Sequence, residues 1–166
     1  FDLAIRIGQL RDSSLIARRL APMRRVVCAA PEYLDARGRP DHPRELKDHE
    51  CLIYSYLSSG REWRFQGAHG ELRVPIQGRL EVNNGDALLA AARQGFGVVM
   101  LPTFLAAADV KAGRLEPVLQ DWCEAEAGGI HAVFPASRNL SPKVRVFVDF
   151  LAQRFAGEPP WDAPGF

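Results

Sequence analysis

An arginine near the end of the first apolar segment is the clearest candidate for binding a charged ligand. Arg6 interrupts the strand pattern of Asp2–Ile7 directly before Gly8. Sheets of α/β proteins bind ligands at the carboxyl ends of their strands, and a guanidinium at such a place can pair with an anion. A structural salt bridge would explain the arginine equally well, so the spacing leaves both interpretations open.

Two asparagines before a helical run form a second candidate site. Asn83 and Asn84 precede Asp86–Arg93, a run of strong helix formers with an apolar face. An asparagine side chain caps a helix by accepting one of its unpaired backbone N–H groups. Because the N–H groups at a helix start also attract anions, we expect ligand contacts at residues 83–86.

The segment after this helix supplies a third set of candidates. Gly95 can end the helix with a positive φ, and Val98–Leu101 is wholly apolar, which is typical of a strand covered on both faces. Pro102 ends that strand. Since a helix followed by a buried strand belongs to an α/β sheet, the loop 101–104 is expected at a ligand-binding edge.

Motifs for catalysis or metal binding are weak in this sequence. Gly95-Phe96-Gly97 follows a helix and lacks the third glycine of a nucleotide-binding loop, so it predicts a helix end and a tight turn. The four histidines show no metal-ligand spacing, and no nucleophile-elbow, zinc-protease or P-loop pattern occurs. We therefore predict no catalytic residue, no metal, no cofactor and no enzyme activity. An enzyme would have to use Cys28 or His131.

The composition is that of an ordinary globular domain. Of 166 residues, 47% are apolar and 25% are charged, and 21 basic residues against 20 acidic ones leave a net charge of +1. This balance argues against nucleic-acid or membrane binding through bulk charge. Three widely spaced cysteines predict buried free thiols in a reducing compartment, and no apolar run is long enough to span a membrane. We expect a cytoplasmic protein.

The rest of the chain must position these candidates, and its pattern alternates strands with helices. Strands are expected at 2–8, 25–30, 51–55, 62–65, 71–74, 78–82, 98–101, 115–119 and 130–134. Helices are expected at 31–37, 44–48, 86–93, 104–110 and from Pro142 onward, whereas 15–20 shows no clear pattern. Pro117 places its strand at a sheet edge. The chain starts in mid-strand without an initiator Met, so we expect a fragment of a longer protein.

The last helix carries apolar residues at helical spacing, and we expect all of them to be buried. They are Val144, Phe147, Val148, Phe150, Leu151 and Phe155. Residues 157–166 are rich in proline and glycine and are expected to form a frayed tail.

The ordered set of segments resembles the effector-binding domain of LysR-type transcriptional regulators. The resemblance rests on FDLAIRIG, GRLEVNNGDALLAAARQGFGVVMLPTF, IHAVFPASRNLSPKVRVFVDFLAQRF and shorter matches, and it covers nearly all of residues 1–156 in family order. It implies an α/β, periplasmic-binding-protein-like (type II) domain. In this fold two lobes are joined by two crossing strands, and a small metabolite binds between them.

The resemblance also implies an organisation for this chain. An incomplete first lobe would comprise residues 1–27 and 131–156, the second lobe residues 28–130, and the tail residues 157–166. Val26–Ala30 and Ile130–Phe134 would be the crossing strands. The winged helix-turn-helix, the linker helix and the first strand–helix–strand of the family have no counterpart in the sequence.

The functional implication is an effector-sensing domain that binds a small, anionic metabolite and passes the signal to DNA. DNA contact would occur only through the missing winged helix-turn-helix, in a homodimer or, at full length, a tetramer, with no membrane partner. The alternative is a periplasmic solute-binding protein of similar fold. The family's ligand positions fall on Arg6, Ile7, Cys28, Asn83, Asn84, Gly85, Pro102, Thr103 and Phe104.

Overall fold

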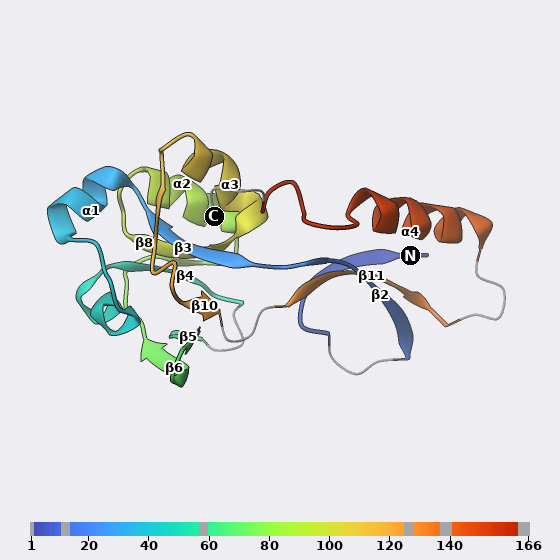
Figure 1. Cartoon of the computed structure of the whole chain (residues 1–166), viewed down its shortest axis with the longest axis horizontal. Helices are drawn as coiled ribbons and strands as arrows, with labels where there is room; N and C mark the ends of the chain where they lie inside the picture. The colour runs from blue at the N-terminus through green and yellow to red at the C-terminus, as the bar shows by residue number, and fades with distance from the viewer. Residues whose placement is uncertain (1, 11–13, 57–59, 125–127, 137–140, 163–166) are drawn as a thin grey trace. The chain divides into compact units, whose positions relative to one another are not determined.

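The chain divides into two units, each with its own sheet. Figure 1 shows the computed structural model, which describes residues 2–10, 14–56, 60–124, 128–136 and 141–162. Unit 1 comprises Phe1–Arg24 and Ala127–Ala163, and unit 2 comprises Arg25–Glu126 and Pro164–Phe166.

Unit 1 contains a three-stranded antiparallel sheet in the order β1-β11-β2. Its strands are β1 (Ala4–Gly8), β2 (Leu15–Pro22) and β11 (Gly129–Pro135). The central strand pairs with β1 in regular register and with β2 through a bulge between Ile130 and His131. β2 was not predicted from the sequence, because two arginines in its middle hide the apolar alternation of an edge strand.

One helix, α4 (Pro142–Arg154), packs against β2 of this sheet. Ser141 is its N-cap residue and Pro142 opens its first turn, as predicted, although the Ser141 side chain makes no capping hydrogen bond. Val144 and Val148 are buried, but Phe147 is 48% and Phe150 58% exposed. The expectation that all six apolar positions are buried was therefore wrong for these two phenylalanines, which lie outside the packed stripe of the helix.

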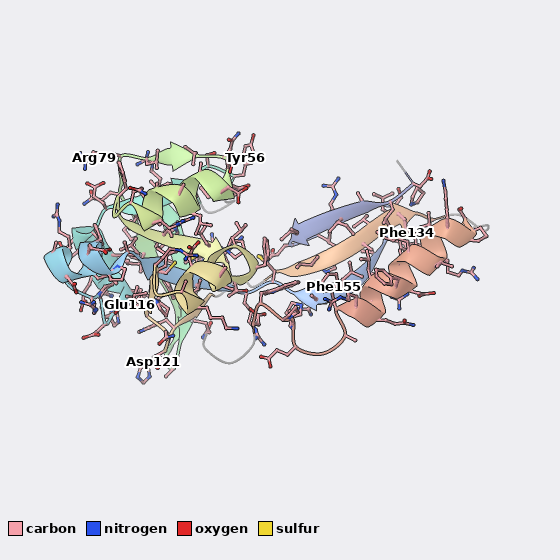
Figure 2. All side chains as sticks on the ribbon, turned by 90° about the horizontal axis from the view of Figure 1, so that it is seen from above. Tyr56, Arg79, Glu116, Asp121, Phe134 and Phe155 are labelled. Atoms are coloured by element: carbon pink, nitrogen blue, oxygen red, sulfur yellow. The ribbon has the colours of Figure 1, made fainter. Side chains whose placement is uncertain are left out.

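The segment after α4 continues to pack in unit 1. The Trp161 ring lies 5.5 Å from that of Phe155, centroid to centroid, and Figure 2 labels Phe155 at the end of the helix. Arg24 Nη1 lies 3.7 Å from Glu158 Oε1 and 3.6 Å from the Asp162 carboxylate. The expectation of a frayed tail was therefore wrong for residues 158–162.

Unit 2 is built on a five-stranded mixed sheet in the order β7-β4-β8-β3-β9. Its strands, in sheet order, are β7 (Glu81–Val82), β4 (Cys51–Tyr54), β8 (Val98–Pro102), β3 (Arg25–Ala29) and β9 (Glu116–Val118). The first three run parallel to one another, whereas β3 is antiparallel to both of its neighbours. Pro117 lies on an edge strand, as predicted.

A second, three-stranded sheet of unit 2 has the order β10-β5-β6. The predicted hairpin is confirmed as β5 (Glu62–Gly67) and β6 (Gly70–Pro75), with β10 (Cys123–Glu124) beside β5. Trp63 and Phe65 point into a core that also includes residues of α1 (Pro31–Arg37) and of the 3-10 helix η1 (Pro43–Asp48).

Two helices, α2 (Gly85–Arg93) and α3 (Thr103–Lys111), cover the opposite face of the five-stranded sheet. Figure 1 shows them on one side of β3, β4 and β8, with the β5–β6 hairpin on the other side. Val98 to Leu101 are all buried as a result, which confirms the prediction of a strand covered on both faces. None of the helices in the described part of the chain combines the length and apolar character needed to cross a bilayer.

The turn between α2 and β8 depends on two glycines. Gly95 has a φ of +75° and ends the helix as predicted. A Cβ on Gly97 would lie 2.2 Å from the carbonyl oxygen of Glu50, which accepts the backbone N–H of Val98 at 2.8 Å. Only glycine allows this approach, which fixes the start of β8 beside β4.

Candidate functional site

Strand direction brings two of the predicted ligand-binding segments to one edge of unit 2. Because β7, β4 and β8 run parallel, their carboxyl ends lie at the same edge of the sheet. Residues 83–85 follow β7 and residues 102–104 end β8 and begin α3. We call this place the carboxyl edge of unit 2. It carries Asn83, Asn84, Gly85, Pro102, Thr103 and Phe104.

The start of α2 is held by the predicted asparagine cap. Asn84 has extended backbone angles, and its Oδ1 accepts the backbone N–H of Ala87 at 3.1 Å. Asn83 Nδ2 donates to the Tyr56 hydroxyl at 3.2 Å. Figure 2 labels Tyr56, which is 72% exposed and follows the end of β4 at the same edge. Sequence reasoning missed this tyrosine, which lies two residues after the end of β4, whereas Asn83 directly follows β7.

The start of α3 lies next to the start of α2. A Cβ on Gly85 would be 2.8 Å from Cδ1 of Leu105, so glycine permits the two helices to meet here. Thr103 is buried and Phe104 is half-buried. The first backbone N–H groups of a helix lack intrahelical acceptors, and the helix dipole adds partial positive charge. Two such helix starts at one edge favour an anionic ligand.

A basic residue from an antiparallel strand reaches the same edge. Arg25 opens β3 and lies opposite Pro102 in the register with β8. The sequence gives no hint of this position, since it depends on the antiparallel pairing of two strands far apart in the chain. Arg25 is half-buried, and by strand alternation its side chain shares the sheet face of Val27, opposite to the two helices.

Cys28 lies in the core and not at the carboxyl edge. Its side chain is fully buried among residues of β8, α2 and α3. Burial, and secondly the nearby Asp109 carboxylate, raise the pKa of its thiol to about 12. Cys51 is also free and buried, whereas the side chain of Cys123 lies outside the described residues. Cys28 thus packs the sheet against the helices.

The two remaining predicted ligand residues belong to unit 1. Arg6 and Ile7 lie on β1, where they pair with His131 and Ile130, and both are exposed. In the described part of the chain Arg6 has no ion-pair partner, so the interpretation of Arg6 as half of a structural salt bridge finds no support there.

The described cavity of unit 2 lies away from the carboxyl edge. It has a volume of about 290 Å³ and is lined by residues 39–41 and 116–122, of which Figure 2 labels Glu116 and Asp121. Arg39 Nε and Nη2 donate to the two Glu116 oxygens at 2.6 and 2.8 Å, which lowers the pKa of that carboxyl. The Arg39 guanidinium and the Glu116 carboxylate, which both line the cavity, therefore neutralise each other.

Side chains for metal binding are not assembled among the described residues. No group of three or more His, Cys, Asp and Glu side chains in this part of the chain could hold a metal ion. The arrangement at the carboxyl edge offers hydrogen-bond donors, the partial positive charge of two helix starts and an aromatic ring, which are features of ligand-binding sites.

Known proteins resemble this chain in sequence and in structure. The family model for the LysR substrate binding domain matches residues 1–156. The transcriptional regulator PtxR of Pseudomonas aeruginosa is 35% identical over 158 residues, which are 95% of this chain and 50% of the regulator. CrgA of Neisseria meningitidis is 34% identical over 92% of this chain and 50% of its own length. The chain thus spans about half the length of the curated relatives it matches.

Solved structures agree with the sequence comparison. The regulatory domain of CrgA superposes with a TM-score of 0.79 at 33% identity, over 93% of this chain and 75% of that domain. Full-length AphB, a virulence activator of Vibrio cholerae, superposes with a TM-score of 0.81 at 26% identity, over 93% of this chain and 52% of AphB. These matches confirm the resemblance and the periplasmic-binding-protein-like type II fold. The chain belongs to the LysR substrate-binding domain family.

Proposed function

We propose that this chain is the effector-sensing part of a LysR-type transcriptional regulator and that its effector is a small, anionic metabolite. One observation carries the ligand class: the starts of α2 and α3 meet at the carboxyl edge of unit 2. Donors and partial positive charge at one edge select an anion.

The proposed effector contacts are the ligand positions implied by the family resemblance, except that Cys28 has a structural role. Backbone N–H groups at Gly85 and Thr103 bind the anionic group, the Asn83 and Asn84 amides orient it, and Phe104 with Pro102 supplies an apolar wall. Arg6 and Ile7, which the family resemblance also places among the ligand contacts, belong to unit 1. Cys28 supports the core beneath this edge, because its side chain is fully buried.

The proposal includes the lobe organisation of the family. The lobes are residues 1–27 with 131–156 and residues 28–130, and Val26–Ala30 and Ile130–Phe134 connect them. The division of the chain between Arg24 and Arg25, and again between Glu126 and Ala127, supports these boundaries. Effector binding changes the balance between lobe arrangements, in proportion to the difference in its affinity for them.

The full-length protein would act in the cytoplasm as a homodimer or tetramer that contacts DNA through an N-terminal winged helix-turn-helix. The relatives PtxR and CrgA are named as transcriptional regulators, which favours this function over a periplasmic solute-binding protein and over an enzyme.

Calorimetry with a panel of small carboxylates, on the full-length regulator, tests the proposal. Asn84→Asp and Asn84→Ser both retain a good helix cap, but only the aspartate adds a negative charge at the carboxyl edge. We expect Asn84→Asp to weaken anion binding about tenfold or more relative to Asn84→Ser, which corresponds to at least about 1.4 kcal/mol.

Two outcomes would overturn the proposal. The first is equal binding by the Asn84→Asp and Asn84→Ser variants. The second is the absence, across the panel, of both binding and any change in operator affinity, measured by fluorescence anisotropy with labelled operator DNA.

A further inference from the structure

The register of the unit 1 sheet places three basic side chains in one row. On the central strand β11, His131 lies directly opposite Arg6 of β1 on one side and Arg19 of β2 on the other. Residues directly opposite each other on neighbouring strands present their side chains to the same face of a sheet. We call Arg6, His131 and Arg19 the basic row.

Close contacts confirm that two members of the basic row meet above the sheet. An ideal Cβ on Gly129, which precedes His131 by two residues on the same face, would lie 2.5 Å from His131 Cε1 and 3.3 Å from Arg19 Nε. The imidazole therefore covers Gly129, and Arg19 Nε lies over the same glycine. On the Arg6 side, a Cβ on Gly8 would meet nothing within 4 Å, so the space beside the row is open.

The face that carries the basic row has no compensating acid in its described strand residues. The other residues that share this face by register are small or apolar; they are Ala4, Gly8, Leu15, Ala17, Pro22, Gly129, Val133 and Pro135. Arg18 points to the opposite face, where it pairs with Asp149 of α4. The neighbouring residue Arg19 has no such partner in the described part of the chain.

The three side chains of the basic row are also unpaired among the described residues. Neither guanidinium has an ion pair there, and the buried Nδ1 of His131 has no hydrogen-bond partner. Arg6 and Arg19 thus place two cations on one face of the sheet, one on each side of the central strand. The glycine at position 8 leaves room beside Arg6, where an anion would neutralise these cations.

We propose that the basic row binds one oxyanion group, a carboxylate or a phosphate, of a small molecule. Each guanidinium offers a planar fork of N–H donors that matches such a group, and the imidazole between them supplies a further donor. The inference rests on the proposed function in one respect, because Arg6 is both a proposed effector contact and a member of the basic row. It adds His131 and Arg19, which are not among the ligand positions implied by the family resemblance.

The basic row can be tested on the 166-residue chain with two probes, inorganic phosphate and benzoate. Binding is followed by calorimetry and by the imidazole signals of His131 in NMR spectra. Arg19→Gln removes one member of the row, and Arg18→Gln removes the same charge one residue away on the opposite face. We expect Arg19→Gln to weaken binding about tenfold or more, and Arg18→Gln to leave it nearly unchanged. The probe that binds more tightly identifies the oxyanion.

Equal losses in the two variants would show a general charge effect and would overturn the inference, as would the absence of binding by both probes. The two proposals fail separately. Metabolite binding that is sensitive to Asn84→Asp but not to Arg19→Gln would sink the basic row alone. Phosphate or benzoate binding that is lost in Arg19→Gln, with no metabolite that changes operator affinity, would sink the proposed function alone.

Discussion

The side chain of Asn84 closes the first turn of α2 through the backbone N–H of Ala87, at 3.1 Å. Replacement by alanine leaves that N–H without an acceptor at the start of a helix that packs on the main sheet of unit 2. We expect Asn84→Ala to lower the free energy of unfolding by about 1 kcal/mol in urea denaturation. Asn83→Ala is the matched control, because its amide bonds only the exposed Tyr56. Equal losses in the two variants would show that the cap has no special role.

Substitution of Gly97 should be more costly than that of Gly95. A Cβ at position 97 would collide with the Glu50 carbonyl at 2.2 Å, whereas position 95 has open space and only its φ of +75° disfavours a side chain. We expect Gly97→Ala to lower the free energy of unfolding by about 2 kcal/mol or more. Gly95→Ala should cost roughly 1 kcal/mol. A reversed order would mean that the Glu50 contact does not constrain the β4–β8 junction.

His49 should make the stability of unit 2 depend on pH. Burial lowers its pKa below the ordinary 6.5, and its Nδ1 lies 3.2 Å from the Tyr33 hydroxyl, which accepts the backbone N–H of Glu50. The unfolded chain therefore takes up the proton first. Stability is complete above pH 6.5 and is lost as pH falls through the lower, folded-state pKa.

Urea denaturation between pH 7.5 and pH 5 measures this effect. The loss of stability on acidification should be smaller in His49→Gln than in the parent chain. His69→Gln changes an exposed histidine of the β5–β6 turn and serves as the control. An unchanged pH dependence in His49→Gln would exclude His49 as its source.

The two buried thiols should resist modification in the folded chain. Burial raises the pKa of both Cys28 and Cys51 to about 12, so neither carries appreciable thiolate at pH 8. In a Cys123→Ser background, a disulfide reagent such as DTNB should titrate both thiols in guanidinium chloride and react with neither in buffer over minutes. Rapid reaction of one thiol in buffer would show that its strand opens readily.

Local sequence signals predicted the α2–β8 region well because all of them favour the same helix and strand. The cap at Asn84, the high helix propensity that follows, Gly95 and the wholly apolar β8 all favour the same outcome. The strand β2 escaped prediction, since its two central arginines obscure the pattern and its partner β11 is distant in the chain. The exposure of Phe147 and Phe150 on α4 was missed because helical spacing shows which face is apolar but not what covers it.

The candidate site likewise contains residues that local sequence signals predicted and residues that they did not. Asn83, Asn84 and the loop at Thr103 could be predicted from helix-start and strand-end signals. Arg25 and Tyr56 reach the carboxyl edge only through strand order, and the basic row exists only through strand register. A local sequence pattern does not show which distant segments pair, so these residues could be identified only from the fold.

The proline in β9 has a consequence for self-association. An outermost strand normally offers a ladder of amide donors to any extended peptide, and such ladders seed fibrils. Pro117 removes one donor from a strand of only three residues, and β7 at the other border has just two. Both edge strands of this five-stranded sheet therefore offer few backbone groups for pairing with a further chain, which protects the sheet against amyloid-like growth.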